Sequence, residues 1–160
     1  MEKVYIGKIV STHGIKGEVK IKSNFQYKDK VFRVGNVLLI DDNEYIIKSY
    51  RVHKGLDMVT LNDYDNINQI LFLMKKNVYF DYSQLELSES EVLDSDLINY
   101  RVLTKDGKEG IIKEIFFASE KNKIMRILID KEYLIPFNGP MIKEISKKDK
   151  YVLIELIDGM

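Results

Sequence analysis

Residues 4–23, VYIGKIVSTHGIKGEVKIKS, decide the fold of the first half of the chain. Apolar and polar side chains alternate over 18–23, a pattern typical of a strand with one buried face. The apolar stretch 4–10 indicates a second strand. Between them, Gly14 and Gly17 allow the positive φ angles of a tight turn. The stretch therefore predicts a β-hairpin at the start of the chain.

Similar strand signals, separated by turn-forming residues, continue to the C-terminus. The other predicted strands lie at 37–40, 44–50, 58–61, 101–104, 110–117, 124–129, 133–137 and 151–157. A helix is expected over 65–74, where apolar side chains recur at helical spacing after an aspartate that can cap its start. The sequence thus predicts a mainly all-β fold of two small β-barrels, with one short helix in the first.

An acidic segment separates the two halves. Residues 83–96 contain five acidic side chains and no basic one, in a Ser-rich stretch without clear apolar periodicity. We therefore expect an N-terminal β-barrel over residues 1–82, an acidic linker over 83–94, and a second β-barrel over 95–160.

Composition excludes several classes of function. The 160 residues include no cysteine, so thiol catalysis, disulfides and cysteine-based metal sites are excluded. No stretch is apolar enough for a signal peptide or a membrane span, so we expect a cytoplasmic protein without membrane contact. The net charge is zero, but residues 1–33 hold eight basic side chains against three acidic ones. One end of the protein is therefore locally basic.

Two short loops combine glycine, histidine and basic residues, a composition suited to RNA phosphates. The candidate RNA-binding residues are His13, Gly14, Ile15, Lys16, Gly17, Lys20, Arg51, His53 and Lys54. A Gly-x-x-Gly loop also occurs in KH modules, but there it joins two helices, whereas this one lies between two predicted strands. An ordinary hairpin with solvated lysines explains the same residues equally well.

No residues suggest a metal site, a cofactor or catalysis. His13 and His53 would need to meet in space, with Asp57 as a third ligand, to hold a metal, and no close-spaced ligand pair is present. Residues 63–74 lack the glycine and glutamate of a calcium loop. Nucleotide-binding and nucleophile-elbow motifs are also missing. We expect a protein that is not an enzyme.

Apolar runs in the second half are candidates for binding another protein. The candidate residues are Phe116, Phe117, Leu134, Pro136 and Phe137. Packing inside a barrel core is the alternative explanation for most of these side chains. Pro136 lacks a backbone N–H and therefore suits the end or edge of a sheet.

The order of these motifs resembles the ribosome maturation factor family RimM from end to end. The resemblance rests on IGKI at 6–9 with HGIKGEV at 13–19, RVHKG at 51–55, DNINQIL at 65–71, DLI at 96–98, LIPF at 134–137 and IKEI at 142–145. The second half resembles a PRC-barrel domain. The chain departs from the family at Val92 and Leu93, where two aromatic residues are usual, and at Asn99, where glycine is usual.

This resemblance implies a two-barrel protein without cofactor or catalysis. It implies binding to the head of the immature small ribosomal subunit, through small-subunit ribosomal RNA and small-subunit ribosomal protein nineteen. A PRC-barrel interaction scaffold not tied to the ribosome is an alternative, but it leaves residues 1–82 unexplained. An RNA-modifying enzyme is a second alternative, and it lacks the clustered acids, histidines or cofactor motif that it would need.

Overall fold

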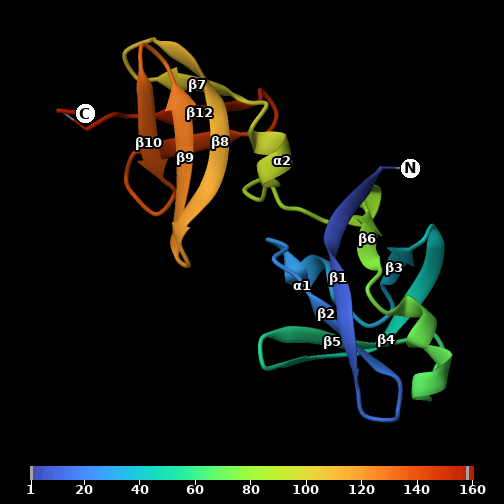
Figure 1. The fold of residues 1–160 in the computed structure, drawn as a ribbon. Helices are drawn as coiled ribbons and strands as arrows, with labels where there is room; N and C mark the ends of the chain where they lie inside the picture. The colour runs from blue at the N-terminus through green and yellow to red at the C-terminus, as the bar shows by residue number, and fades with distance from the viewer. Residues whose placement is uncertain (1, 158) are drawn as a thin grey trace. The chain divides into compact units, whose positions relative to one another are not determined.

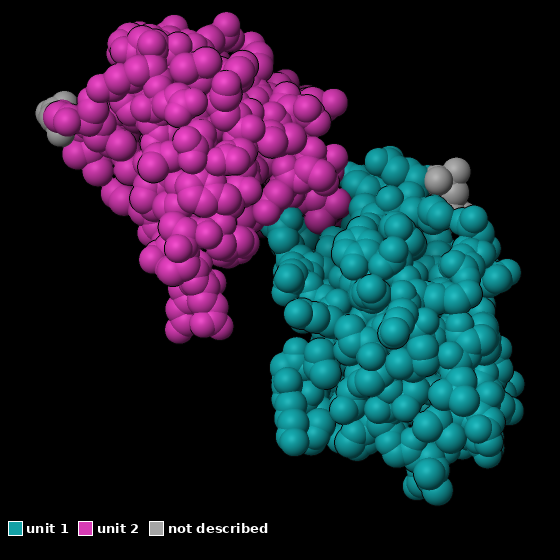
Figure 2. All heavy atoms as spheres, viewed as in Figure 1, with its two compact units in different colours: residues 1–86 teal, residues 87–160 magenta. Residues whose placement is uncertain are grey.

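A computed structural model describes residues 2–157, 159 and 160. The chain divides into two compact units, residues 1–86 and residues 87–160, shown in two colours in Figure 2. Each unit has its own cluster of buried apolar side chains. Each unit is therefore a β domain with its own hydrophobic core.

The first unit is a closed barrel of six strands in the order β1-β2-β5-β4-β3-β6 (Figure 1). The strands are β1 (Lys3–His13), β2 (Glu18–Lys22), β3 (Val37–Ile40), β4 (Asn43–His53), β5 (Leu56–Leu61) and β6 (Asn77–Asp81). A short helix, α1 (Lys28–Val31), follows β2, and three 3-10 turns are η1 (Ile67–Gln69), η2 (Leu71–Leu73) and η3 (Tyr82–Gln84). Because β6 pairs with both β1 and β3, the sheet has no free edge.

Strand β1 is longer than predicted and contains two irregularities. Its register shifts between Tyr5 and Gly7 against β6, and between Ile9 and Ser11 against β2. Each shift resets the alternation of side chains. As a result Ile6 and Ile9 are both buried in the barrel although they are three residues apart.

The prediction of a helix over 65–74 is wrong, because this segment forms the two 3-10 turns η1 and η2. Its N-cap is Asn66, whose side chain accepts from the Asn68 backbone N–H, and not an aspartate. Backbone groups of neighbouring residues bond to β1 and its hairpin instead of to a helix. The Ile67 N–H donates to the Ile15 carbonyl at 3.0 Å, and the Lys75 N–H donates to the Ile9 carbonyl at 2.9 Å. These tertiary bonds divide the segment into short turns.

The second unit contains one six-stranded sheet in the order β10-β9-β8-β7-β12-β11. Its elements are α2 (Asp94–Leu97), β7 (Arg101–Thr104), β8 (Glu109–Ser119), β9 (Asn122–Leu128), β10 (Glu132–Pro136), β11 (Ile142–Ser146) and β12 (Tyr151–Ile154). Pro136 ends the edge strand β10, as expected for a residue without a backbone N–H. The prediction of a mainly β chain with two β domains is confirmed. Among the described residues, backbone pairing closes the first sheet into a barrel and leaves the second sheet open.

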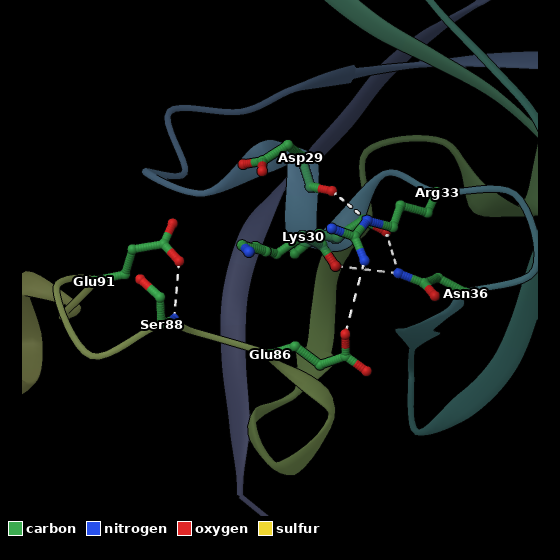
Figure 3. A network of polar contacts seen from close by, with 8 residues as sticks. Asp29, Lys30, Arg33, Asn36, Glu86, Ser88 and Glu91 are labelled. Carbon is green, nitrogen blue, oxygen red and sulfur yellow. Dashed lines mark hydrogen bonds and ion pairs between the residues drawn. The ribbon is translucent and has the colours of Figure 1, made fainter.

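Two acidic residues near the boundary between the units, Glu86 and Glu91, each contact residues of their own unit (Figure 3). In the first unit, the Arg33 guanidinium lies 3.9 Å from Glu86, and the Asn36 amide donates to the backbone carbonyl of Lys30. In the second, the Ser88 N–H donates to Glu91 at 2.9 Å.

The two residues that replace the aromatic pair usual in the family are buried in the second unit. Val92 is 7% exposed and belongs to the core cluster of this unit, and Leu93 is 4% exposed and precedes α2. Two buried aliphatic side chains therefore stand where the family usually has two aromatic ones. The domain boundaries expected at residues 82 and 95 stay predictions.

Candidate nucleic-acid interface

The outer surface of the first barrel carries the candidate RNA-binding residues on neighbouring strands. Lys20 on β2 lies opposite Ser11 on β1 and opposite Met58 on β5, and Met58 lies opposite Arg51 on β4. Met58 is fully buried but lies outside the core cluster of the barrel. Its register indicates that the aliphatic stems of Lys20 and Arg51 cover it, with their charged ends free to reach solvent.

Side chains of the β1–β2 hairpin and of the β4–β5 hairpin meet on this surface. The rings of His13 and His53 have their centroids 5.4 Å apart. The Arg51 guanidinium donates two hydrogen bonds to the Glu18 carboxylate, each 2.9 Å long. The two loops that the sequence indicated separately therefore form one cluster, which we call the hairpin cluster: His13, Glu18, Lys20, Arg51 and His53.

The turn between β1 and β2 is held by backbone contacts. Gly14 and Gly17 have φ angles of 67° and 88°, in the left-handed region that favours glycine. A Cβ at Gly17 would lie 3.3 Å from the backbone nitrogen of Asn66, so this turn packs closely on the start of η1. Ile15 and Lys16 lie on its outside, and the Ile15 residue is 79% exposed. The turn thus presents an apolar and a basic side chain on a fixed backbone.

The charges of the hairpin cluster shift the pKa values of its members. The two hydrogen bonds from Arg51 hold the pKa of the Glu18 carboxyl below its usual range. The pKa of His53 is lowered, first by desolvation and then by the charges of Arg51, His13, Lys54 and Lys20. His53 is therefore mainly uncharged at neutral pH in the free protein.

Three basic residues of the candidate set form no ion pair within the described part of the chain: Lys16, Lys20 and Lys54. Arg51, in contrast, is already paired with Glu18. Glu18 was not among the site residues predicted from the sequence, although it belongs to the same alternating pattern as Lys20. A surface with several unpaired cations and one acid suits a polyanion such as RNA.

The two histidines meet, but the third ligand considered for a metal does not join them. Asp57 is buried on β5, where it accepts a hydrogen bond from the Tyr50 hydroxyl at 2.7 Å and forms an ion pair with Lys28. Desolvation, together with the hydrogen bond to Asp57, raises the pKa of Tyr50 to about 12. Among residues 2–157, 159 and 160, no group of three side chains is placed to hold a metal ion.

The five candidate protein-binding residues of the second unit lie on two faces of its sheet. Phe116 and Pro136 are each opposite Ile124 on β9, and Leu134 is opposite Arg126 two positions further along β9. These three side chains therefore share the face on which Leu134 is 50% exposed.

Phe117 and Phe137 instead surround a lysine on the other side of the same strands. The ammonium of Lys123 lies 5.9 Å from the ring centre of Phe117 and 4.8 Å from that of Phe137, and it pairs with Asp94 at 2.6 Å. The five candidate residues of the second unit thus divide between one sheet face and one cluster of aromatic rings around Lys123.

No helix among the described residues is long and apolar enough to cross a membrane.

Comparisons with known proteins agree along the whole chain. The RimM N-terminal domain matches residues 4–85, and the PRC-barrel domain matches residues 89–160. The ribosome maturation factor RimM of Staphylococcus aureus strain MRSA252 is 39% identical over 166 residues, which cover 99% of this chain and 98% of the relative. The protein of the same name from strain N315 has the same identity and coverage. A solved Pseudomonas aeruginosa structure, described as a 16S ribosomal RNA processing protein RimM, is 22% identical, covers 98% of each chain and has a TM-score of 0.47.

Proposed function

We propose that this chain, which belongs to the RimM family of ribosome maturation factors, assists maturation of the small ribosomal subunit by binding its head during assembly. The observation that carries the proposal is the meeting of the two basic hairpins on one face of the first barrel. In the proposal this face binds small-subunit ribosomal RNA, and the protein acts in the cytoplasm without cofactor or catalysis.

Lys16, Lys20 and Lys54 are the phosphate-binding residues of this proposal. They lack an acidic partner among the described residues, so an RNA phosphate would be their first strong counter-charge. The compact turn at Gly14 and Gly17 would position Lys16 without further ordering of the backbone.

The second unit would bind small-subunit ribosomal protein nineteen, as the family resemblance implies. Its sheet face with Phe116, Leu134 and Pro136 supports a protein contact, because the half-exposed Leu134 lies there in register with Arg126, whose guanidinium lies 5.5 Å from the centre of the Phe116 ring. The same guanidinium pairs with Glu114 and Glu132, so this face combines apolar and charged groups. Binding RNA and protein together would hold one arrangement of the subunit head. The factor leaves the finished subunit only if it binds the immature one more tightly.

Co-sedimentation with ribosomal subunits tests the proposal. We expect the protein in the free small-subunit fractions of a lysate at low salt, with less at moderate salt, and not with whole ribosomes. The Lys16→Gln/Lys20→Gln variant should bind purified immature subunits more weakly. The slope of its log affinity against log salt should fall by about 1 for each phosphate contact that is lost.

Lys48→Gln is the matched control, because Lys48 is exposed on β4 and forms no ion pair among the described residues. Absence from small-subunit fractions at both salt concentrations would contradict the proposal. It would favour the scaffold alternative, in which the PRC-type unit binds proteins outside the ribosome. Unchanged binding of the Lys16→Gln/Lys20→Gln variant would contradict the assigned role of the hairpin.

Binding should strengthen as the pH falls, because the negative charge of RNA phosphates would raise the pKa of His53, which desolvation and then the neighbouring cations lower in the free protein. A pKa higher in the complex means that binding takes up a proton. Affinity should therefore rise as the pH falls through the pKa of the complex and level off below the pKa of the free protein. Subunit affinity measured from about pH 7.5 to about pH 5.5 checks this window. The His53→Gln variant should show a weaker dependence, and an identical one would refute the role of His53.

A further inference from the structure

Next to the hairpin cluster, two lysines lie directly opposite each other on adjacent strands. Lys8 on β1 pairs in register with Lys22 on β2. Both residues are exposed, and neither forms an ion pair among the residues that the structure describes. Like charges directly opposite each other on a sheet are unfavourable. The pair is a concentrated positive charge that an anion between the two ammonium groups would relieve.

The irregular backbone of β1 produces this arrangement. The register shift beside Gly7 places Lys8 on the outer face, while Ile6 and Ile9 both point into the barrel. A Cβ at Gly7 would lie only 2.4 Å from the carbonyl oxygen of Lys22, so the two strands approach each other closely here. The lysine pair therefore lies on closely packed, paired strands and not in a loop.

Beyond Lys8, the outer face of β1 carries an exposed aromatic ring. Tyr5 is 54% exposed and packs edge to face on Tyr79 of β6, with the ring centres 5.7 Å apart. The ammonium of Lys3 lies 5.1 Å from the centre of the Tyr79 ring. Tyr5 is thus supported along one side and open to solvent elsewhere, which is the geometry of a platform for an unpaired base.

The basic surface ends beyond Tyr5. Lys3 pairs with Asp42 at 2.6 Å, and Lys76 pairs with Asp41, so these cations are already neutralised. In the other direction, Lys22 and Lys20 are two residues apart on β2 and lead to the hairpin cluster. We call the surface of Tyr5, Lys8, Lys20 and Lys22 the β1–β2 track. The strand distance from Tyr5 to His13 is about 26 Å, enough for several nucleotides.

We propose that a single-stranded RNA segment binds along the β1–β2 track, with a phosphate between Lys8 and Lys22 and a base stacked on Tyr5. A single strand fits this surface better than a duplex. The exposed Tyr5 ring can stack only on a base that is not already stacked between the neighbouring bases of a duplex. A peptide with acidic side chains would satisfy the lysines but would leave the Tyr5 ring without a planar partner. The inference rests on the proposed function, in which RNA occupies the adjacent hairpin cluster.

Fluorescence anisotropy of the full chain with a labelled oligouridylate of twelve nucleotides tests this inference. Tyr5→Leu should weaken binding about tenfold, because stacking of one base on an aromatic side chain is lost, whereas Tyr5→Phe should stay within about twofold of the parent protein. Lys8→Gln/Lys22→Gln should lower the slope of log affinity against log salt by about 0.7, the value for one phosphate contact with a single strand, because the two lysines share one phosphate. Lys48→Gln is the control for charge alone.

The Lys8→Gln/Lys22→Gln variant should stay folded, because it removes the repulsion between the two lysines. Its melting temperature should equal or exceed that of the parent protein. Unchanged affinity of Tyr5→Leu together with an unchanged salt slope of Lys8→Gln/Lys22→Gln would overturn the inference. Equal binding of a duplex, or equal competition by polyglutamate, would also overturn it.

Sedimentation of the same variants with small subunits separates this inference from the proposed function. If subunit binding persists while all variants bind the oligouridylate like the parent protein, the track inference fails and the proposed function stands. If the parent protein does not sediment with subunits but Tyr5→Leu weakens oligouridylate binding, the proposed function fails and the track inference stands.

Discussion

Replacing Lys28 by methionine should destabilise the first unit by about 2 kcal/mol, because it leaves the Asp57 carboxylate buried without a counter-charge. The Asp57 side chain is 2% exposed, and its Oδ2 atom lies 2.8 Å from the Lys28 ammonium. That oxygen accepts no well-aligned hydrogen bond from any residue that the structure describes, so the attraction between the two charges is its main compensation. The value is below the range for fully buried pairs because the Lys28 side chain is 34% exposed and therefore partly screened. Urea denaturation measures the change.

A double-mutant cycle distinguishes the ion pair from general packing. In an Asp57→Asn background the carboxylate charge is gone, so Lys28→Met should cost little more. Tyr50 keeps an acceptor in that background, since the asparagine carbonyl can replace the carboxylate oxygen bonded to its hydroxyl. An equal loss of stability in both backgrounds would show that Lys28 stabilises the first unit independently of the Asp57 charge.

Replacing Gly7 by alanine should destabilise the first barrel by about 3 kcal/mol, the upper end of the usual cost of overpacking. The new Cβ would lie 2.4 Å from the Lys22 carbonyl oxygen and 3.0 Å from the Cβ of Ser23, so β1 and β2 must move apart. The closed barrel resists such a movement, because β1 is also paired with β6. Thermal or urea unfolding of the full chain gives the measurement.

Gly14→Ala is the matched control for this substitution. Nothing lies within 4 Å of a Cβ at Gly14, and only its positive φ of 67° is unfavourable for alanine, so we expect a cost of about 1 kcal/mol. Gly110→Ala should act on the second unit instead, because its Cβ would lie 2.4 Å from the Leu128 carbonyl oxygen. Similar losses for Gly7→Ala and Gly14→Ala would show that β1 and β2 can separate at low cost.

Predictions from local pattern were reliable where one strand and its turn determine the outcome. The strand at 37–40 agrees with β3, and the expected hairpin at Gly14 to Gly17 forms between β1 and β2. Strands β6 and β11 and the short helix α1 were not predicted. The sequence NVYFD of β6 has buried Val78 and Phe80 in alternation, so a period-two pattern was present but too short to stand out.

The assignment of functional residues depended more strongly on distant contacts. The apolar runs of the second half supplied five candidate protein-binding residues, but adjacent residues of a strand point to opposite faces of the sheet. Phe116 and Phe117 are therefore separated by the sheet, and the second of them lies near Lys123. Whether the candidate residues bind RNA or ribosomal protein nineteen stays a prediction.

The mainly β fold, the basic character of the first hairpin and the family can all be predicted from the sequence, because alternation, turn residues and ordered motifs are local properties of a chain. The tertiary structure alone decided that His13 meets His53, that Arg51 pairs with Glu18, and that Lys8 lies opposite Lys22. These contacts depend on strand register and on the bulges of β1, which are set by pairing between segments far apart in the sequence. The opening stretch thus predicts a hairpin, and the closed barrel places its charges beside those of the second loop.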